Sequence, residues 1–139
     1  MNDLNLIIIK GVSGSGKSTF ANFLRSLLYT DEVVHCEADH FMIENGEYKF
    51  DANKLNFAHN QCKNRAKDAM KKNTRVIIVS NTSVKQNSIR PYLDLAKQYN
   101  YRVTSLCLEN LHGNKNVHNL PELTLQNQET SLRSSLKLR

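Results

Sequence analysis

Eight consecutive residues near the amino terminus, Gly11 to Ser18, follow the phosphate-binding loop pattern G-x-x-x-x-G-K-[ST]. Its glycines let backbone N–H groups point at phosphate oxygens, where a side chain would block the approach. Lys17 can reach the β- and γ-phosphates, and the Ser18 hydroxyl is the expected Mg²⁺ ligand. The sequence therefore predicts a site for ATP and Mg²⁺. The predicted nucleotide-binding residues are Gly11, Ser13, Gly14, Ser15, Gly16, Lys17, Ser18 and Thr19.

A second candidate group, Asp39, follows a short apolar run that is typical of a strand. In a parallel sheet the ligand lies at the carboxyl ends of the strands, so Asp39 can face the γ-phosphate across the loop. A carboxylate there can accept the proton of an attacking hydroxyl, as the base of kinases does. A solvated turn aspartate, or one that orients Mg²⁺ through water, is the alternative. Lys17 and Asp39 are thus the predicted catalytic residues.

The elements that must position these residues alternate between strands and helices. Apolar runs predict strands at residues 6–9, 33–36, 75–80 and 102–108, and helical spacing predicts helices at 19–28, 52–72, from Ser83 onward and after Pro121. The alternation indicates a three-layer α/β fold with a mostly parallel sheet of about four strands flanked by helices. With the phosphate-binding loop after the first strand, this order is expected for a P-loop NTPase/kinase fold. The first helix is expected to bury Phe20, Phe23, Leu24, Leu27 and Leu28.

Composition narrows the class of protein. The 139 residues suit a single domain, and the net charge of +6 is compatible with an anionic partner such as nucleic acid. No apolar run is long enough for a membrane span, and the amino terminus lacks a signal-peptide pattern. The three cysteines are scattered without metal-ligand spacing, which favours reduced thiols in the cytoplasm, with the nucleus left open.

Beyond the loop, the chain resembles the polynucleotide-kinase-like P-loop kinases, which include phage polynucleotide 5′-hydroxyl kinases and animal P-loop proteins that bind ubiquitin ligases. The resemblance covers residues 5–108. The run Ala38-Asp39-His40-Phe41, followed by Asn-Gly-x-Tyr-x-Phe-Asp at 45–51, is its more specific part. The remaining matches are Gly11–Thr19, Leu55, Ala58-His59, Arg65-Ala66, Ala69-Met70, Ile77–Val84 and Pro91-Tyr92.

The resemblance implies that Lys17 and Ser18 serve ATP and Mg²⁺, that Asp39 activates the acceptor, and that Asn81 and Thr82 lie near the acceptor. Two departures stand out. Met42 occupies the position of an arginine in the phage enzymes, and most of a basic lid helix is missing after residue 109. The domain is therefore predicted to span residues 1–139, with a shortened lid and a C-terminal helix at about 110–139.

These features favour a kinase that transfers the γ-phosphate of ATP to a hydroxyl, with the 5′-hydroxyl of a nucleic-acid end as acceptor. A small-molecule kinase for a nucleoside or sugar would use the same loop and aspartate. A nucleotide-binding module without transfer activity, acting through a protein partner, is the alternative that the shortened lid and Met42 favour. The lysines and arginines of the 52–72 helix are either a solvated face or contacts to a nucleic-acid backbone. No feature of the sequence indicates an oligomeric state.

Overall fold

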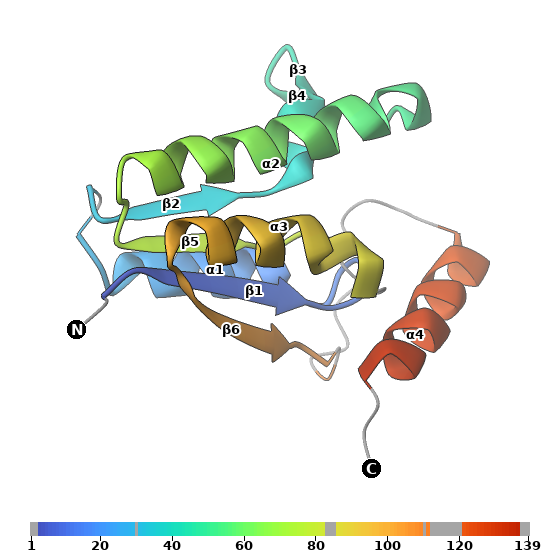
Figure 1. Ribbon diagram of the computed structural model, residues 1–139. Helices are drawn as coiled ribbons and strands as arrows, with labels where there is room; N and C mark the ends of the chain where they lie inside the picture. Colours follow the sequence, from blue (N-terminus) through green and yellow to red (C-terminus); the bar gives the residue numbers. More distant parts are fainter. Residues whose placement is uncertain (1–2, 30, 83–85, 110, 112–120, 137–139) are drawn as a thin grey trace.

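A four-stranded parallel sheet forms the centre of the molecule (Figure 1). The structure, a computed structural model, describes residues 3–29, 31–82, 86–109, 111 and 121–136. The strands lie in the order β2-β5-β1-β6, and each neighbouring pair is parallel. Their bounds are Asn5–Lys10 for β1, Val33–Cys36 for β2, Val76–Val79 for β5 and Arg102–Cys107 for β6. The predicted fold class is confirmed.

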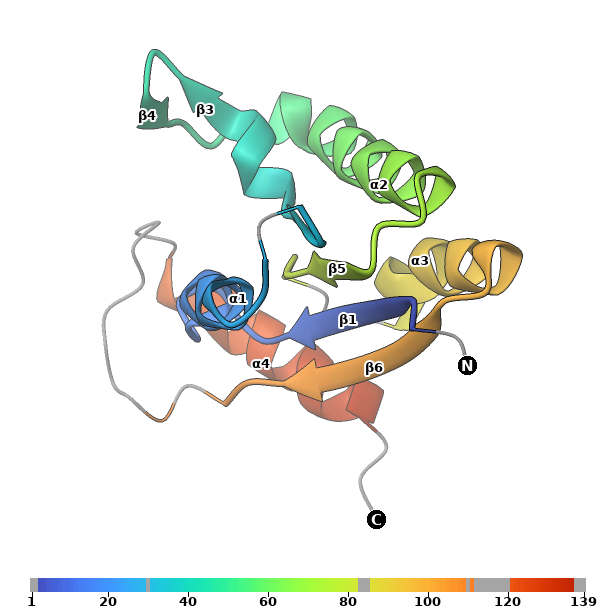
Figure 2. The same ribbon diagram turned by 90° about the vertical axis from the view of Figure 1, so that its left-hand side faces the viewer.

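Helices cover both faces of this sheet (Figure 2). Two of them, α2 and α3, pack on one face, and α1 packs on the other. The fourth, α4, stands beyond the carboxyl ends of β1 and β6 (Figure 1). The helices span Lys17–Ser26 (α1), Leu55–Lys71 (α2), Gln86–Tyr99 (α3) and Glu122–Leu136 (α4). Within the described parts of the chain, no helix is long and apolar enough to cross a bilayer.

Short elements connect β2 to α2. The 3₁₀ turn η1 (Ala38–Met42) leads into a hairpin of β3 (Ile43–Glu44) and β4 (Glu47–Tyr48), and η2 (Ala52–Lys54) precedes α2. The hairpin turn is Asn45-Gly46, with φ values of 53° and 80°. Both residues need positive φ in this turn, and Asn-Gly is the dipeptide that adopts it most readily.

The larger of two buried clusters lies on the α2–α3 face of the sheet, where the side chains of Leu6, Ile8, Ile77 and Val79 are fully buried. Alanines and Cys62 on α2 meet them, because small side chains at three- and four-residue steps let the helix lie close to the sheet. The spacing of Leu55, Ala58, Cys62, Ala66 and Ala69 predicts the inward face of this helix. The last four are buried as predicted, whereas Leu55 at the start of the helix is 38% exposed.

The expected burial of α1 is wrong in part. Phe23 and Leu27 are 55% and 65% exposed, while the buried side of the helix consists of Ala21 with the half-buried Phe20, Leu24 and Leu28. Residues 20, 24 and 28 form one i, i+4 row, and this row faces the sheet together with Ala21. The row at 23 and 27 is turned away from it.

Two further predictions concern α3. The spacing of Ile89, Leu93 and Ala96 predicts the inward face of this helix; Ile89 and Ala96 are buried, and Leu93 is partly buried. The helix continues through Pro91 from Gln86 to Tyr99. The sequence from Ser83 to Gln86 fits a capping box that would open the helix, and residues 83–85 lie outside the described part of the chain.

Candidate active site

The phosphate-binding loop joins β1 to α1 and is shaped by its glycines. Gly14 and Gly16 have φ values of 81° and 96°, which side-chain-bearing residues rarely adopt. A Cβ added to Gly11 would collide with the Ser15 hydroxyl and lie 3.0 Å from the carbonyl oxygen of Leu108. The Phe20 amide donates to the Gly16 carbonyl at 2.9 Å as α1 begins. The loop therefore ends at a helix amino terminus, the backbone arrangement that binds phosphates.

Lys17 is folded back over this loop. Its ammonium group donates to the carbonyl oxygen of Val12 at 2.8 Å, and the residue is only 6% exposed. Burial lowers the pKa of Lys17 to about 8, against the opposing effect of the carboxylates of Glu37 and Asp39. A buried cation beside an anion-binding loop gains from the arrival of a phosphate, because the phosphate replaces the water that burial removed.

Ser18 points at a carboxylate that the sequence reasoning did not single out as a site residue. Its hydroxyl lies 2.7 and 2.8 Å from the two carboxylate oxygens of Glu37, the residue directly after β2. A hydroxyl and a carboxylate are the oxygen ligands that Mg²⁺ prefers, so this pair fits the ion that the loop motif implies. The signal for Glu37 was its position at a strand end, two residues before Asp39.

Asp39 lies on η1 and is partly buried. The Tyr48 hydroxyl on β4 donates to its Oδ1 at 3.3 Å. Burial raises the pKa of Tyr48 to about 12, with Asp39 contributing, so the phenol keeps its proton and remains a donor. The hairpin that follows η1 thus holds the Asp39 carboxylate in an orientation that leaves it on the wall of a cavity.

This cavity, the acceptor cavity, has a volume of about 300 Å³ and brings together the loop and the predicted acceptor residues. Ser13 of the loop, Asp39, Asn81 and Thr82 all line it, and the hydroxyls of Ser13 and Thr82 are 3.4 Å apart. The walls also include Tyr48, Phe50 and Leu55, so part of the surface is apolar. Residues that are distant in the sequence and predicted to act together therefore line the same cavity.

A helix that the sequence only weakly defined completes the acceptor cavity. Thr124 and Gln128 of α4 line it, and the Gln128 side-chain oxygen accepts from the Ser13 amide at 2.9 Å. Leu132, one turn further along the helix, is 4% exposed. No pattern in the sequence pointed to Gln128, because α4 has a poorly defined apolar face and its contact is a single polar side chain.

The other predicted nucleotide-binding residues differ in their surroundings. Ser15 is buried, and its hydroxyl oxygen has no hydrogen-bond partner among the described residues. Thr19 is exposed on the first turn of α1. The roles of these residues stay predictions. The resemblance leaves Lys115 and His118, and further along the chain Arg133, as basic residues that could replace the missing lid helix. Lys115 and His118 lie outside the described residues, and Arg133 on α4 is paired with Glu129 at 2.8 Å.

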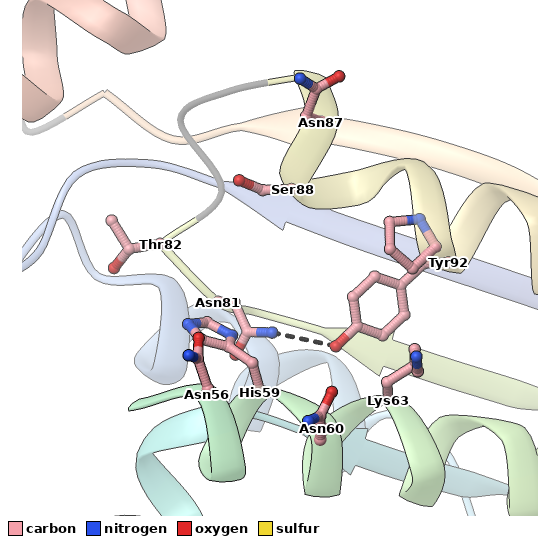
Figure 3. A pocket seen from close by; sticks show the side chains of 10 residues that line it. Asn56, His59, Asn60, Lys63, Asn81, Thr82, Asn87, Ser88 and Tyr92 are labelled. Atoms are coloured by element: carbon pink, nitrogen blue, oxygen red, sulfur yellow. Dashed lines mark hydrogen bonds between the residues drawn. The ribbon is translucent and has the colours of Figure 1, made fainter. Parts of the chain in front are cut away.

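Asn81 ties three elements together. Its side-chain oxygen accepts from the Ala38 amide at 2.6 Å, and its side-chain nitrogen lies 3.3 Å from the Tyr92 hydroxyl (Figure 3). The Sγ of Cys62 accepts from the Asn81 amide group at 3.4 Å and from the Tyr92 hydroxyl at 3.2 Å. Asn81 is 5% exposed. Its amide is thus a structural link between the end of β5, η1 and α3 at the edge of the site.

We expect Asn81→Ala to lower the free energy of unfolding by about 1–3 kcal/mol, because the buried Ala38 amide would lose its acceptor and the Tyr92 hydroxyl would lose the side-chain amide that donates to it. Urea denaturation followed by circular dichroism measures this. Asn60→Ala is the matched control, since Asn60 is an exposed asparagine on α2 nearby, and its effect should stay below about 0.5 kcal/mol. Equal stability of the two variants would contradict the structural link.

A second cavity of about 320 Å³ adjoins the acceptor cavity between α2 and α3 (Figure 3). The two share His59, Asn81 and Thr82 in their walls. A third, more open hollow of about 540 Å³ shares Lys63, Asn87 and Pro91 with the second. The three cavities, neighbours through these shared walls, follow one another from the loop along the α2–α3 groove, and together they are called the α2–α3 trough. Its basic residues are Lys63, Lys67 and Arg90.

The family of the chain follows from a comparison with known proteins. Residues 6–110 match the model of a family described as an AAA domain. Human NEDD4-binding protein 2 is 38% identical over 103 residues, which cover 72% of this chain and 6% of that protein. The chain thus corresponds to a small part of the human relative.

Solved structures share the fold. A chain of the Pnkp1/Rnl/Hen1 RNA repair complex superposes with a TM-score of 0.74 at 19% identity, covering 96% of this chain and 45% of the other. The APS kinase of Mycobacterium tuberculosis superposes with a TM-score of 0.57 at 13% identity, covering 97% of this chain and 98% of the kinase chain. With its glycine loop, parallel sheet and matched residues 6–110, the chain belongs to the AAA domain family of P-loop proteins and has the fold of P-loop kinases.

Proposed function

We propose that this domain transfers the γ-phosphate of ATP to the 5′-hydroxyl at the end of a nucleic-acid strand. The observation that carries the proposal is the acceptor cavity, where the Asp39 carboxylate and Ser13 of the phosphate-binding loop line one space of about 300 Å³. A hydroxyl in this cavity would meet a proton acceptor on one wall and the phosphate-binding loop on another.

In the proposed reaction the acceptor oxygen bonds to the γ-phosphorus, the bond between that phosphorus and the β–γ bridging oxygen breaks, and ADP leaves. Asp39 accepts the proton of the acceptor hydroxyl. Lys17 stabilises the negative charge on the phosphates. Ser18 and Glu37, which already contact each other, would hold Mg²⁺, and the ion supplies further neutralisation of phosphate charge.

The α2–α3 trough supports a polynucleotide as acceptor over a small molecule. A strand whose 5′ end lies at Asp39 could continue through the second cavity past Lys63 and Lys67, which are one helical turn apart, about 6 Å along α2. No carboxylate of the described residues lies within ion-pairing distance of Lys63, Lys67 or Arg90. These cations are therefore available to backbone phosphates, in keeping with the net charge of +6.

The experiment that tests the proposal measures transfer of labelled γ-phosphate from Mg²⁺·ATP to 5′-hydroxyl RNA and DNA oligonucleotides, with nucleosides and sugars as further acceptors. Transfer to oligonucleotides supports the proposal. Transfer to nucleosides or sugars alone would replace it by a small-molecule kinase. ATP binding without transfer to any acceptor would replace it by a nucleotide-binding module that acts through a protein partner.

Removing the positive charges of the trough should weaken the binding of oligonucleotide acceptors and leave mononucleoside acceptors unaffected. We expect Lys63→Gln combined with Lys67→Gln to weaken oligonucleotide binding and to reduce the slope of log K against log salt by about 1.4, since two phosphate contacts to a single strand are lost. Transfer to a mononucleoside acceptor, where one is accepted, should not change.

The matched control replaces Lys71 and Lys72 by glutamine. Both are exposed at the end of the same helix, and neither lines the trough. Fluorescence anisotropy over a salt series measures the slope for each variant. An identical slope for the Lys63/Lys67 variant and the wild type would rule out this route for the strand.

A further inference from the structure

Three side chains with metal-binding atoms lie close together beside the phosphate-binding loop, where one of them contacts Ser18. They are His35 and Glu37 at the end of β2 and His40 on η1. The Nε2 atoms of His35 and His40 lie 3.7 and 3.5 Å from the same carboxylate oxygen, Oε2 of Glu37. One ligand atom from each residue lies within 4.8 Å of the other two. We call this group the His-Glu-His cluster.

Local backbone geometry brings the cluster together. Residues two apart on an extended chain point to the same side, which pairs His35 with Glu37. The chain then enters the 3₁₀ turn, where the His40 amide donates to the Glu37 carbonyl at 3.1 Å and places His40 above Glu37. The sequence His-x-Glu-x-x-His across a strand end and a 3₁₀ turn is therefore sufficient to form the cluster.

The donor set differs from the set expected for Mg²⁺. Two imidazole nitrogens and one carboxylate oxygen suit Zn²⁺ and similar transition-metal ions, whereas Mg²⁺ prefers oxygen ligands. In a tetrahedral Zn²⁺ site with metal–ligand bonds of about 2.0–2.1 Å, the ligand atoms lie about 3.4 Å from each other. The two nitrogen–oxygen distances in the cluster are 3.5 and 3.7 Å, close to this value.

Burial and access also suit a metal ion. The side chains of His35 and Glu37 are 2% and 8% exposed, while His40 is 39% exposed and leaves a way in from solvent. The Nε2 of His35 lies 2.5 Å from the buried Ser80 hydroxyl, and a metal ion at this nitrogen would take the place of that hydrogen bond. The two imidazole rings meet edge to face, with planes 86° apart, so they approach the carboxylate from different directions.

We propose that His35, Glu37 and His40 bind a Zn²⁺-class transition-metal ion, and that this ion weakens binding of Mg²⁺·ATP. The link is Glu37, whose two oxygens both contact the Ser18 hydroxyl of the nucleotide loop. A metal ion on Oε2 of Glu37 occupies that oxygen and neutralises the carboxylate, which makes Glu37 a weaker ligand for the Mg²⁺ that accompanies ATP at Ser18. Thermodynamic linkage requires that bound Mg²⁺·ATP lower the affinity for the transition-metal ion by the same factor.

The test measures Zn²⁺ binding to the nucleotide-free chain by isothermal titration calorimetry, and Co²⁺ binding by visible absorption. We expect one Zn²⁺ per chain, and a tetrahedral Co²⁺ spectrum. His40→Gln should weaken Zn²⁺ binding at least about 10-fold with unchanged thermal unfolding, because His40 is the exposed member of the cluster. Cys107→Ser is the control for adventitious binding to an exposed thiol and should leave the Zn²⁺ affinity unchanged.

Wild-type Zn²⁺ affinity in His40→Gln would overturn the proposed site. The coupling is tested by titrating Mg²⁺·ATP with and without one equivalent of Zn²⁺. We expect the ATP affinity of the wild type to fall at least about fivefold in Zn²⁺, and that of His40→Gln to stay constant. An unchanged ATP affinity in the Zn²⁺-loaded wild type would overturn the coupling through Glu37. None of these measurements requires phosphate transfer, so the result is independent of the proposed reaction.

Discussion

Asp39→Asn is expected to reduce γ-phosphate transfer by about 10²–10⁴-fold, the range in which general bases contribute to rates. The amide has the shape of the carboxylate, and its oxygen can still accept from the Tyr48 hydroxyl that lies 3.3 Å from Asp39 Oδ1. It cannot take the proton of the acceptor hydroxyl. Because Asp39 is assigned to the acceptor and not to the nucleotide, the affinity for Mg²⁺·ATP should stay within about twofold of the wild type.

Single-turnover kinetics and calorimetry on the same preparation separate the two effects. Glu44→Gln, which neutralises an exposed carboxylate on the β3–β4 hairpin, is the matched control and should leave both unchanged. A normal rate in Asp39→Asn would mean that another group takes the proton. Equal losses of transfer and of ATP binding would assign Asp39 to the nucleotide instead.

Lys17→Met is expected to weaken ATP binding by about 10–100-fold, since a charge-assisted contact to the phosphates is lost. The same change should make the nucleotide-free protein more stable at pH 7. Burial lowers the pKa of Lys17 from 10.5 to about 8, which corresponds to a cost of about 3 kcal/mol for the charged form. The lost hydrogen bond to the Val12 carbonyl offsets roughly 2 kcal/mol, so a net gain of about 1 kcal/mol remains.

The pH dependence of this gain has a definite sign. Between pH 8 and 10.5 the unfolded chain binds more protons at Lys17 than the folded chain, so the stability of the wild type through this group rises with pH. The advantage of Lys17→Met should therefore shrink as the pH rises through this window.

Urea denaturation at pH 7 and pH 10 measures the difference between Lys17→Met and the wild type. Lys97→Met, which removes an exposed lysine on α3, controls for the change of residue type. A Lys17→Met protein that is less stable than the wild type at pH 7 would contradict the burial cost assigned to this ammonium group.

Much of the fold could be predicted because its signals are local. The apolar run at β5 and the glycine loop after β1 each determine their own backbone, and alternation along the chain determines the parallel sheet. Where a prediction failed, the missing information was tertiary. Phe23 and Leu27 have the spacing of an inward stripe, yet the sheet meets only the neighbouring row of α1, so their exposure could not be derived from periodicity.

The site shows the same division. The loop motif is continuous in sequence, so the sequence alone predicts Lys17 and Ser18 as nucleotide-binding residues. The sequence alone does not predict Glu37 as a site residue, because its partner Ser18 lies on another element. Only the folded chain shows the 2.7 Å contact between them. Gln128 could not be predicted from the sequence for the same reason, since it is a single polar side chain on α4 that contacts the loop residue Ser13, 115 positions away in the sequence. The assigned roles of Asp39, Asn81 and Thr82 stay predictions until the variants are measured.

The hydrogen bond from the Ser13 amide to Gln128 has a consequence for any measured nucleotide affinity. A phosphate oxygen that takes this amide must displace the glutamine, so α4 acts as an internal competitor tethered to its own target. A neutral hydrogen bond of about 0.5–1.5 kcal/mol corresponds to a roughly 2- to 10-fold rise in the apparent dissociation constant. If the Ser13 amide binds phosphate as predicted, the dissociation constant measured on the intact chain would exceed that of a loop without the Gln128 contact.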